Sequence, residues 1–465
     1  MQLREILSLP ADSKIILNVG YADSRKGIDL FVDVACKILK EHPDVWFVWV
    51  GLRDESFMQS ILTGIERSGF ANRILFPGIR RDDIDIFYSG SDIFLLTSRE
   101  DPFPSVVLDA MNTRLPVIGF DNAGGFKDII TETTGVLVPY LSGERMADAV
   151  SQVLKDPDLQ IQLGNNAADL IERKFSFPDY IYSLLAILGH DYKKISVILP
   201  SYNYEHYLPE RMQSIMSQTY PVYEIIAIDD NSKDRSAEIL RQSAKHAPVP
   251  FKVMVNRENS GSVFRQWAKG IASARGDYIW IAEADDLSEN RFLEEVMKGF
   301  HDETVVLSYS QSRQIDEFGT IIAHNYYEYT NDVDPDQWKQ DYLRPGQDEI
   351  RGSFAIKNII PNVSAVVFKR VDISGIVEDL TRYKVAGDWY FYIWLLRTGS
   401  IFYHAESLNL HRRHKKSVTR SENAQQHFDE IVMVQNFVMN NFPVEPGTRE
   451  KVLRYRENIH TYLLN

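Results

Sequence analysis

The feature that most constrains the fold of this chain is an alternation of short apolar runs with amphipathic stretches, which occurs twice along the sequence. Parallel sheets covered by helices on both faces have this pattern, because their strands are buried on both sides. The runs in the first half are residues 15–19, 45–50, 74–76, 93–97, 116–120 and 136–138. Those in the second half are residues 195–199, 224–228, 252–255 and 278–282. The sequence therefore predicts an α/β fold in both halves.

The restart of this pattern predicts two domains. A long amphipathic stretch over residues 143–175 closes the first half, and the apolar run 195–199 opens the second. A chain of 465 residues is also too long for one ordinary core. We expect a first domain over residues 1–188, a second over 194–420, and a polar, helical C-terminal tail over 421–465.

The composition limits the partners and the setting. The net charge of −14 disfavours binding to nucleic acid, whose phosphates would repel the chain. Cys36 is the one cysteine, so no disulfide can form within the chain, and its place in a helical pattern indicates a buried thiol. The N-terminus lacks the apolar core of a signal peptide, and no run approaches the roughly 20 apolar residues of a spanning helix. We expect a cytoplasmic protein, with peripheral association at the inner face of the membrane left open.

Carboxylates follow two of the predicted strands in the second half. Asp229 and Asp230 follow the second strand of this half, and Glu283, Asp285 and Asp286 follow the fourth. Ligands of open α/β sheets bind at the carboxyl ends of strands. Clustered carboxylates are tolerated where a cation such as Mn²⁺ or Mg²⁺ compensates their charge. The structural alternatives are helix capping by the first pair and a solvated acidic turn for the second cluster.

Asp388 and a basic cluster lie farther along the chain. Asp388 opens an aromatic stretch of helical character, where an Asp taken alone is an ordinary helix cap. Residues 411–416 read His-Arg-Arg-His-Lys-Lys. A basic cluster in an acidic chain suits an anionic partner such as a diphosphate, because Arg and Lys form charge-assisted hydrogen bonds with it. A plain surface patch is the alternative.

The order of these sites resembles that of glycosyltransferase family 2, which has the GT-A fold. The resemblance covers residues 194–420 and starts at Ile-Ser-Val-Ile-Leu-Pro-Ser-Tyr-Asn. The segments that carry it are residues 195–203, 208–221, 228–232, 259–262 and 274–286. Glu283 stands where the family usually has Asp, which keeps the carboxylate. Gly387 stands where most members have an acidic residue.

This resemblance implies a metal-dependent, inverting transfer of a sugar from a nucleotide-sugar donor. Mn²⁺ or Mg²⁺ is the implied cofactor, and Asp388 is the implied base that takes the proton from the acceptor hydroxyl. The segment 308–370 is expected to shape the acceptor side, with 358–364 lining it. The implied ligands of the nucleotide sugar are Pro200, Tyr202, Asp230, Glu283, Asp285 and Arg413, and those of the metal are Asp285, Asp286 and His414.

A second set of candidate donor-binding residues lies in the first half. The junction 19–27 lacks the Gly-x-Gly-x-x-Gly and Walker spacings, which argues against a nicotinamide or ATP site. Asp101 and Asp109 are separated by seven residues, and a glycine at position 124 permits close approach of a ligand. Residues 1–188 resemble the donor-binding half of glycosyltransferase family 4, which has the GT-B fold. The resemblance implies that Asp101 contacts the donor sugar, Asp109 the ribose and Lys26 the diphosphate, with Gly124 in the same site.

The acceptor half of that family has no counterpart in this sequence. We therefore expect the first domain either to serve as a scaffold or to bind a donor without transferring it, with independent catalysis as the alternative. For the whole chain we expect transfer to a glycan or lipid-linked acceptor in surface-polysaccharide synthesis. A nucleotidyltransferase and a non-catalytic sugar-binding scaffold are the alternatives. The donor sugar, the nucleotide and the oligomeric state stay open.

Overall fold

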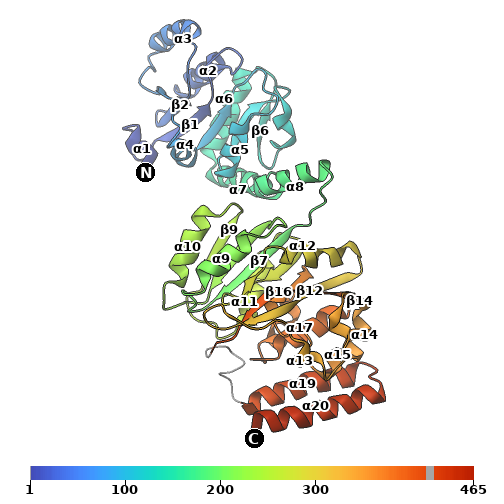
Figure 1. The fold of residues 1–465 in the computed structure, drawn as a ribbon. Helices are drawn as coiled ribbons and strands as arrows, with labels where there is room; N and C mark the ends of the chain where they lie inside the picture. Colours follow the sequence, from blue (N-terminus) through green and yellow to red (C-terminus); the bar gives the residue numbers. More distant parts are fainter. Residues whose placement is uncertain (1, 415–423, 465) are drawn as a thin grey trace. The chain divides into compact units, whose positions relative to one another are not determined.

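The computed structural model describes residues 2–414 and 424–464. Contacts within the chain divide it into two compact units, Met1–Ile181 and Tyr182–Asn465. Both units are α/β, and a helical segment ends the chain, which confirms the predicted fold class (Figure 1). Lys415 and Lys416 of the predicted basic cluster, and residues 421–423 of the predicted tail, lie outside the described residues.

The first unit is built on a parallel sheet of six strands in the order β3-β2-β1-β4-β5-β6. Each strand coincides with one of the predicted apolar runs to within two residues. The reason is that both faces of the sheet are covered, so its strands are almost wholly apolar. The strands are β1 (Lys14–Val19), β2 (Val45–Val50), β3 (Ile74–Gly78), β4 (Ile93–Leu96), β5 (Val117–Phe120) and β6 (Gly135–Val138).

Helices follow the strands of this unit, where the sequence has amphipathic stretches. The amphipathic stretch 143–175 forms two helices. The first helix ends because Pro157 has no backbone N–H with which to continue it. The second helix is capped by the Asp156 carboxylate, which accepts a hydrogen bond from Leu159 N. The helices are α1 (Gln2–Ile6), α2 (Ile28–Ile38), α3 (Glu55–Ser68), α4 (Ile84–Gly90), α5 (Ser105–Asn112), α6 (Gly143–Lys155), α7 (Pro157–Lys174) and α8 (Phe177–Ile187), which runs across the boundary between the units.

The second unit is built on a mixed sheet in the order β11-β16-β12-β15-β10-β7-β8-β9. The parallel part is the predicted one, with strands β7 (Ile195–Ser201), β8 (Glu224–Asp229), β9 (Phe251–Val255) and β10 (Tyr278–Ile281). The antiparallel strand β15 (Val366–Lys369) joins β10 to the remaining strands, which are β11 (Leu287–Ser288), β12 (Val305–Ile315), β13 (Ile321–Ala323), β14 (Tyr342–Pro345) and β16 (Ser400–Arg412). The strands beyond β10 were not predicted.

Helices cover both faces of this sheet, and each face has its own apolar core. The longer ones are α9 (Leu208–Met216), α10 (Ser236–His246), α11 (Val263–Ser273) and α17 (Gly387–Leu396). Short helices are α12 (Phe292–Met297), α13 (Tyr327–Thr330), α14 (Gly346–Arg351), α15 (Ser353–Ile356) and α16 (Val377–Leu380).

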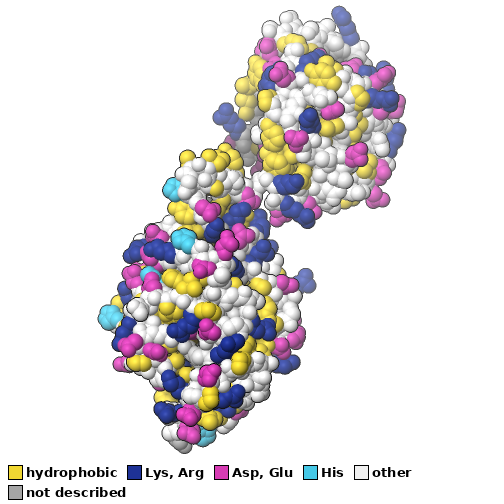
Figure 2. Space-filling view, turned by 90° about the vertical axis from the view of Figure 1, so that its right-hand side faces the viewer, with side chains coloured by type: hydrophobic (Ala, Val, Ile, Leu, Met, Phe, Trp, Pro, Cys, Tyr) yellow, Lys and Arg dark blue, Asp and Glu magenta, His cyan; other side chains and the backbone are white. Residues whose placement is uncertain are grey.

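The chain ends in a helical hairpin of α19 (Ala424–Asn441) and α20 (Pro446–Leu464). Ile431, Val434 and Val452 of this hairpin belong to the same core as α17, so the hairpin is packed onto the second unit (Figure 1). None of the helices within the described ranges is long and apolar enough to cross a membrane. Figure 2 shows basic and acidic side chains interspersed on both units, so the face that it draws carries charges of both signs.

Candidate functional site

A cavity of about 500 Å³ opens at the carboxyl ends of β7 and β8 in the second unit. Parallel strands bring their carboxyl ends to the same edge, which is where open α/β sheets bind ligands. Four of the residues predicted to bind a nucleotide sugar line this cavity: Pro200, Tyr202, Asp230 and Glu283. Tyr202 is 43% exposed, so its ring is available for stacking. Two further lining residues, Tyr383 and Lys384, were missed by sequence reasoning.

Asp230 is a buried carboxylate fixed by donors from the next loop. Its oxygens accept hydrogen bonds from Asn256 Nδ2 at 2.7 Å, from Ser260 N at 2.9 and 3.1 Å, and from Ser260 Oγ at 2.9 Å. Asp229, the residue before it, closes a turn: its Oδ2 accepts from Ser232 N at 2.9 Å, and the next helix begins only at Ser236. Neither of the two neighbouring carboxylates therefore caps this helix.

The acidic loop after β10 places its three carboxylates in different surroundings. Glu283 reaches the cavity and accepts from Trp267 Nε1 at 3.3 Å. Burial, and then the charges of Asp285 and Asp286, raise the pKa of Glu283 to about 8. Asp286 is 2% exposed and points inward, where it accepts from Asn362 Nδ2 at 2.8 Å, Ser364 Oγ at 2.7 Å and Arg412 N at 2.9 Å. Part of the segment 358–364 therefore lies beneath the acidic loop and anchors it.

Asp285 is the carboxylate that faces His414. Its Oδ2 lies 2.9 Å from His414 Nε2, and the aromatic rings of Tyr204 and Tyr207 flank that imidazole. One carboxylate and one imidazole are a partial ligand set for Mn²⁺ or Mg²⁺, cations that complete their coordination with phosphate oxygens and water. Over residues 2–414 and 424–464, no group of three or more His, Cys, Asp or Glu could hold a metal ion by itself. The residues thus fit a metal that shares its coordination with a diphosphate.

Asp388 lies in the first turn of α17 and is partly buried. Its carboxylate accepts from Asn358 Nδ2 at 3.2 Å and from its neighbour Trp389 N at 2.7 Å. Tyr329 in turn donates its hydroxyl to the carbonyl of Asn358 at 2.8 Å. Burial raises the pKa of Asp388 to about 7, against the hydrogen bonds that favour its charged form. A carboxylate with that pKa is suited to proton transfer near neutral pH.

The basic cluster is largely taken up by contacts within the protein. Arg412 is 2% exposed and donates to the carbonyl of Asp285 and to Glu210 Oε2, at 2.8 and 3.0 Å. His411 Nδ1 lies 2.6 Å from the hydroxyl of Tyr326. Arg413 is partly exposed, and its backbone N–H donates to the carbonyl of Ile315. In the described part, 411–414, the cluster therefore supports the acidic loop from inside more than it forms a surface patch.

Arg211 is a buried cation that sequence reasoning missed. It is 0% exposed, donates to Ser288 Oγ at 3.0 Å, and has its guanidinium 5.0 Å from the centre of the Trp280 ring. Burial lowers the pKa of Arg211 to about 10, while the charges of Asp286, Asp285 and Glu283 oppose that change. The sequence does contain a signal of this burial: Arg211 lies on the same helix face as Leu208, Met212 and Ile215. A charged residue on an apolar helix face is unusual.

The candidate residues of the first unit lie in two places. Lys26 and Asp101 form an ion pair with each other, and both side chains are largely buried. Gly124 forms a parallel bridge with Asp101, so close that a Cβ on Gly124 would lie 1.7 Å from the Asp101 carbonyl oxygen. Asp109 lies on α5, and the residue as a whole is exposed. Partial desolvation of its carboxyl, together with the charge of Asp85, raises its pKa.

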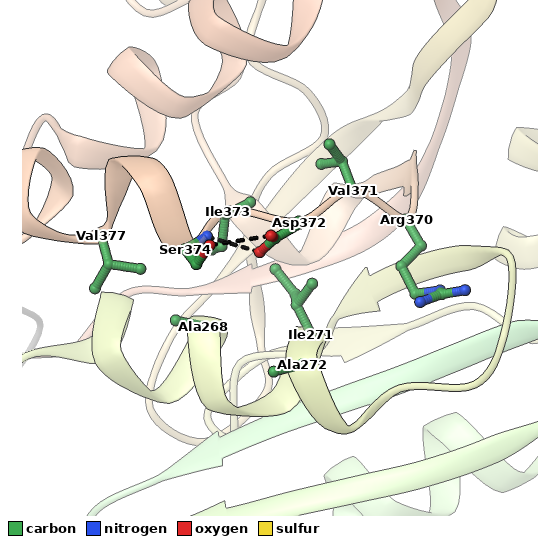
Figure 3. Close-up of a pocket in the computed structure, with 9 residues that line it drawn as sticks. All are labelled: Ala268, Ile271, Ala272, Arg370, Val371, Asp372, Ile373, Ser374 and Val377. Carbon is green, nitrogen blue, oxygen red and sulfur yellow. Dashed lines mark hydrogen bonds between the residues drawn. The ribbon is translucent and has the colours of Figure 1, made fainter.

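A second cavity in the second unit lies away from all of these residues. It measures about 670 Å³ and is formed by α11 and the segment 370–377 (Figure 3). Its polar side chains are engaged locally: Arg370 Nε donates to the carbonyl of Gly276, and Asp372 accepts from Ser374 N and Oγ. No residue predicted from the sequence to bind a ligand lies in it.

Two family models match the chain. The model described as glycosyl transferases group 1 matches residues 2–170, and that described as glycosyl transferase family 2 matches residues 196–356. The two matches lie in different halves of the chain. The predicted fusion is thereby confirmed.

Curated relatives and a solved structure are similar to parts of the chain. The chain is 31% identical over 176 residues to the alpha-D-kanosaminyltransferase of Streptomyces kanamyceticus, covering 38% of this chain and 45% of the relative. It is 30% identical over 162 residues to the lipopolysaccharide core biosynthesis mannosyltransferase LpcC of Rhizobium leguminosarum bv. viciae, covering 34% and 45%. The chain thus spans less than half the length of these relatives. A crystal structure of S. aureus TarS 1-349 in complex with UDP-GlcNAc is 15% identical with a TM-score of 0.44, covering 58% of this chain and 73% of that chain.

Proposed function

We propose that this chain is a glycosyltransferase whose second unit transfers a sugar from a nucleotide-sugar donor to a hydroxyl group of a glycan or glycoconjugate, with inversion at the anomeric carbon. The observation that carries the proposal is the cavity at the ends of β7 and β8, lined by Tyr202, Asp230 and Glu283. The loop that contains Glu283 also supplies Asp285, which is paired with His414 beyond the end of β16. The names of the relatives, which include a lipopolysaccharide core mannosyltransferase, support surface glycans as the acceptor class.

The lining residues of the cavity suit the nucleotide part of the donor. Tyr202 offers an exposed ring for the base, and Asp230, fixed by Asn256 and Ser260, offers a rigid acceptor for a ribose hydroxyl or a base N–H. Lys384 brings a positive charge to the same cavity, where its Nζ donates to the carbonyl of Gly261. A cation at that place suits the diphosphate.

Asp285 and His414 are the residues that would hold Mn²⁺ or Mg²⁺, and Asp286 fixes the loop from below. A divalent metal bound there would neutralise the charge that develops on the departing nucleoside diphosphate. Two residues orient the same loop: Trp267 Nε1 donates to the carboxylate of Glu283, and Ser364 Oγ accepts from the backbone N–H of Glu283. A fixed loop lowers the cost of arranging these groups during the reaction.

Asp388 is the base in this proposal. As the acceptor oxygen forms its bond to the anomeric carbon, Asp388 takes the hydroxyl proton, and the bond from that carbon to the diphosphate breaks with its electron pair going to the phosphate oxygen. The products are the glycoside and a nucleoside diphosphate. Asn358 and the N–H of Trp389 hold the carboxylate in place, and its pKa of about 7 lets it accept a proton near neutral pH.

A release assay over a panel of nucleotide sugars tests the proposal. The full chain is incubated with UDP-glucose, UDP-GlcNAc or GDP-mannose and Mn²⁺, and the nucleoside diphosphate that appears is measured. A parallel incubation supplies a nucleoside triphosphate and a sugar 1-phosphate, and the pyrophosphate that appears is measured. Release of nucleoside diphosphate from at least one nucleotide sugar is expected. Release of pyrophosphate in the parallel incubation would instead establish a nucleotidyltransferase, and tight binding of a nucleotide sugar without turnover over a range of acceptors would establish a sugar-binding scaffold.

A further inference from the structure

The C-terminal hairpin places a buried carboxylate next to the segment that carries Asp388. The hairpin lies outside residues 196–356, the part of the second unit that matches the family model. Glu430 of α19 is 3% exposed and points from the hairpin into the body of the unit. A buried carboxylate costs free energy unless it is well hydrogen-bonded.

Glu430 is bonded to three successive backbone groups. Its oxygens accept from Lys384 N at 2.9 Å, from Val385 N at 2.8 Å and from Ala386 N at 3.0 Å. Helix α17 begins at the next residue, and Asp388 is in its first turn. The carboxylate thus fixes the backbone at the start of the helix whose first turn carries the proposed base.

Helix α19 also supports the segment that carries Asn358, the hydrogen-bond partner of Asp388. Gln435 of α19 is 0% exposed, and its Nε2 donates to the carbonyl of Ile356 at 2.6 Å. Arg456 of α20 donates to Gln435 Oε1, also at 2.6 Å, which fixes the amide. Asn358, two residues beyond Ile356, donates to Asp388. The hairpin therefore supports both the carboxylate of Asp388 and the amide that orients it.

We propose that Glu430 is a positioning residue for Asp388, and that the C-terminal hairpin is in this way a working part of the active site. The three N–H groups at positions 384–386 precede a helix start, where backbone donors have no partner within the helix. All three N–H groups donate to the single carboxylate of Glu430, and these charge-assisted hydrogen bonds fix the backbone conformation at positions 384–386. The catalytic meaning of this contact rests on the proposed function, but the contact itself can be tested without turnover.

The charges around Asp388 give the test a second readout. Glu430 of α19 is the carboxylate whose charge acts on Asp388, and it raises the pKa of Asp388 in addition to burial. The other titratable groups that respond to Asp388 are the hydroxyls of Tyr329 on α13 and Tyr392 on α17. Removing the charge of Glu430 therefore lowers the pKa of Asp388. Loss of packing would lower this pKa as well, because it would expose the carboxyl to water, but it would do so also in Glu430→Asp, which keeps the charge.

The test compares Glu430→Gln, Glu430→Asp and the control Asp429→Asn in the full chain. Asp429 is the exposed neighbour of Glu430 on α19, and its carboxylate is bonded to Gln425. Hydrogen–deuterium exchange is followed over residues 383–389, and the titration of Asp388 is followed by carboxyl carbon NMR, with its signal assigned from the Asp388→Asn variant.

In Glu430→Gln we expect exchange over 384–386 to be at least about tenfold faster, and the Asp388 titration to move to lower pH. Glu430→Asp keeps the charge, so Asp388 should titrate near its wild-type pH in this variant. If Glu430→Gln does not fold, the comparison of Glu430→Asp with the wild type provides the test. Wild-type exchange and an unmoved titration in Glu430→Gln would overturn the proposal. If the wild-type chain releases no nucleoside diphosphate from any donor, the proposed function fails, whereas the two readouts still decide whether Glu430 positions Asp388.

Discussion

His414 Nε2 and Asp285 Oδ2 lie 2.9 Å apart although the two residues are 129 positions apart in the sequence. One follows β16 and the other follows β10, so the fold of the whole second unit is needed to bring them together. The carboxylate of Asp286 is engaged by Asn362, Ser364 and the backbone of Arg412. Of these two aspartates of the acidic loop, Asp285 is therefore the one that is placed, with His414, to meet a cation.

The first prediction concerns metal-assisted binding at this pair. Asp285→Ala and His414→Ala should each reduce the enhancement of UDP binding by Mn²⁺ by about tenfold or more, and Asp285→Ala should remove turnover. Calorimetry with UDP, with and without Mn²⁺, measures the effect. Glu289→Gln is the control, since that carboxylate lies just beyond the loop and pairs with Arg313. Full activity of the wild type in EDTA, or of Asp285→Ala, would refute the assignment.

The second prediction concerns Asp388. Asp388→Asn keeps the shape of the side chain but removes the proton acceptor, so turnover should fall by roughly 10²–10⁴-fold while the affinity for the donor changes little. Wild-type turnover should rise with pH and level off above about 7, because the carboxylate accepts a proton only when it is ionised. An equal loss of donor binding in the variant would make Asp388 a structural helix cap.

The same carboxylate also predicts a change in stability with pH. The pKa of Asp388 is raised in the folded chain from 3.8 to about 7, so the folded state binds the proton more tightly than the unfolded state. The stability that Asp388 contributes is therefore complete below about pH 4 and is lost as the pH rises to about 7. Thermal unfolding of Asp388→Asn at pH 8 should occur at a higher temperature than that of the wild type.

The sequence predicted the parts of the fold whose signal is local. Buried parallel strands such as β7 and β8 read as continuous apolar runs. Strand β12 was missed because buried polar residues interrupt it, among them Ser310, Gln311 and Ser312, which find their partners only in the folded chain.

The same limit applies to the site. Asp230 and Glu283, which follow the ends of strands, line one cavity because the ends of these strands meet at one sheet edge. Inward contacts such as those of Asp286 and Arg412 depend on segments more than a hundred residues away, and a linear pattern carries no signal of them. In the sequence, Glu430 does not differ from the other polar residues of its helix, and only its three backbone partners in the folded chain distinguish it.

The third prediction uses two buried tyrosines. Within the described residues, the hydroxyl of Tyr392 is buried without a hydrogen-bond partner, whereas that of Tyr403 accepts from Gln311 Nε2 and donates to the carbonyl of Trp338. Tyr392→Phe should leave the free energy of unfolding unchanged or raise it by up to about 1–3 kcal/mol, and Tyr403→Phe should lower it by a similar amount. Denaturant unfolding of both variants checks this. A loss in Tyr392→Phe as large as that in Tyr403→Phe would contradict the prediction.

The fourth prediction compares two glycines of the first unit. A Cβ on Gly124 would lie 1.7 Å from the carbonyl oxygen of Asp101, so Gly124→Ala must displace backbone and should cost about 1–3 kcal/mol or more. Gly64 lies inside α3 with open space around the same position, and Gly64→Ala should stabilise by about 0.5–1 kcal/mol. Thermal unfolding of the two variants should therefore shift in opposite directions, and a harmless Gly124→Ala would show that the bridge between Gly124 and Asp101 is not rigid.

The last prediction concerns the ion pair between Lys26 and Asp101. Lys26 is the predicted contact of the diphosphate and Asp101 that of the donor sugar, yet each holds the other in the ligand-free chain. A bound diphosphate must therefore compete with Asp101 for the lysine. Asp101→Asn removes this competitor and should tighten binding of UDP by about tenfold, since a charge-assisted hydrogen bond contributes about 1.5–3 kcal/mol. UDP-glucose should gain less than UDP, because the same change removes the contact to its sugar.

Calorimetry on the full chain in EDTA, which suppresses metal-assisted binding in the second unit, gives both affinities. Asp33→Asn is the matched control, because it breaks an exposed Lys–Asp pair of the same unit. Equal gains for both ligands would show that Asp101 does not meet the sugar, and binding of neither ligand would leave the first unit a scaffold.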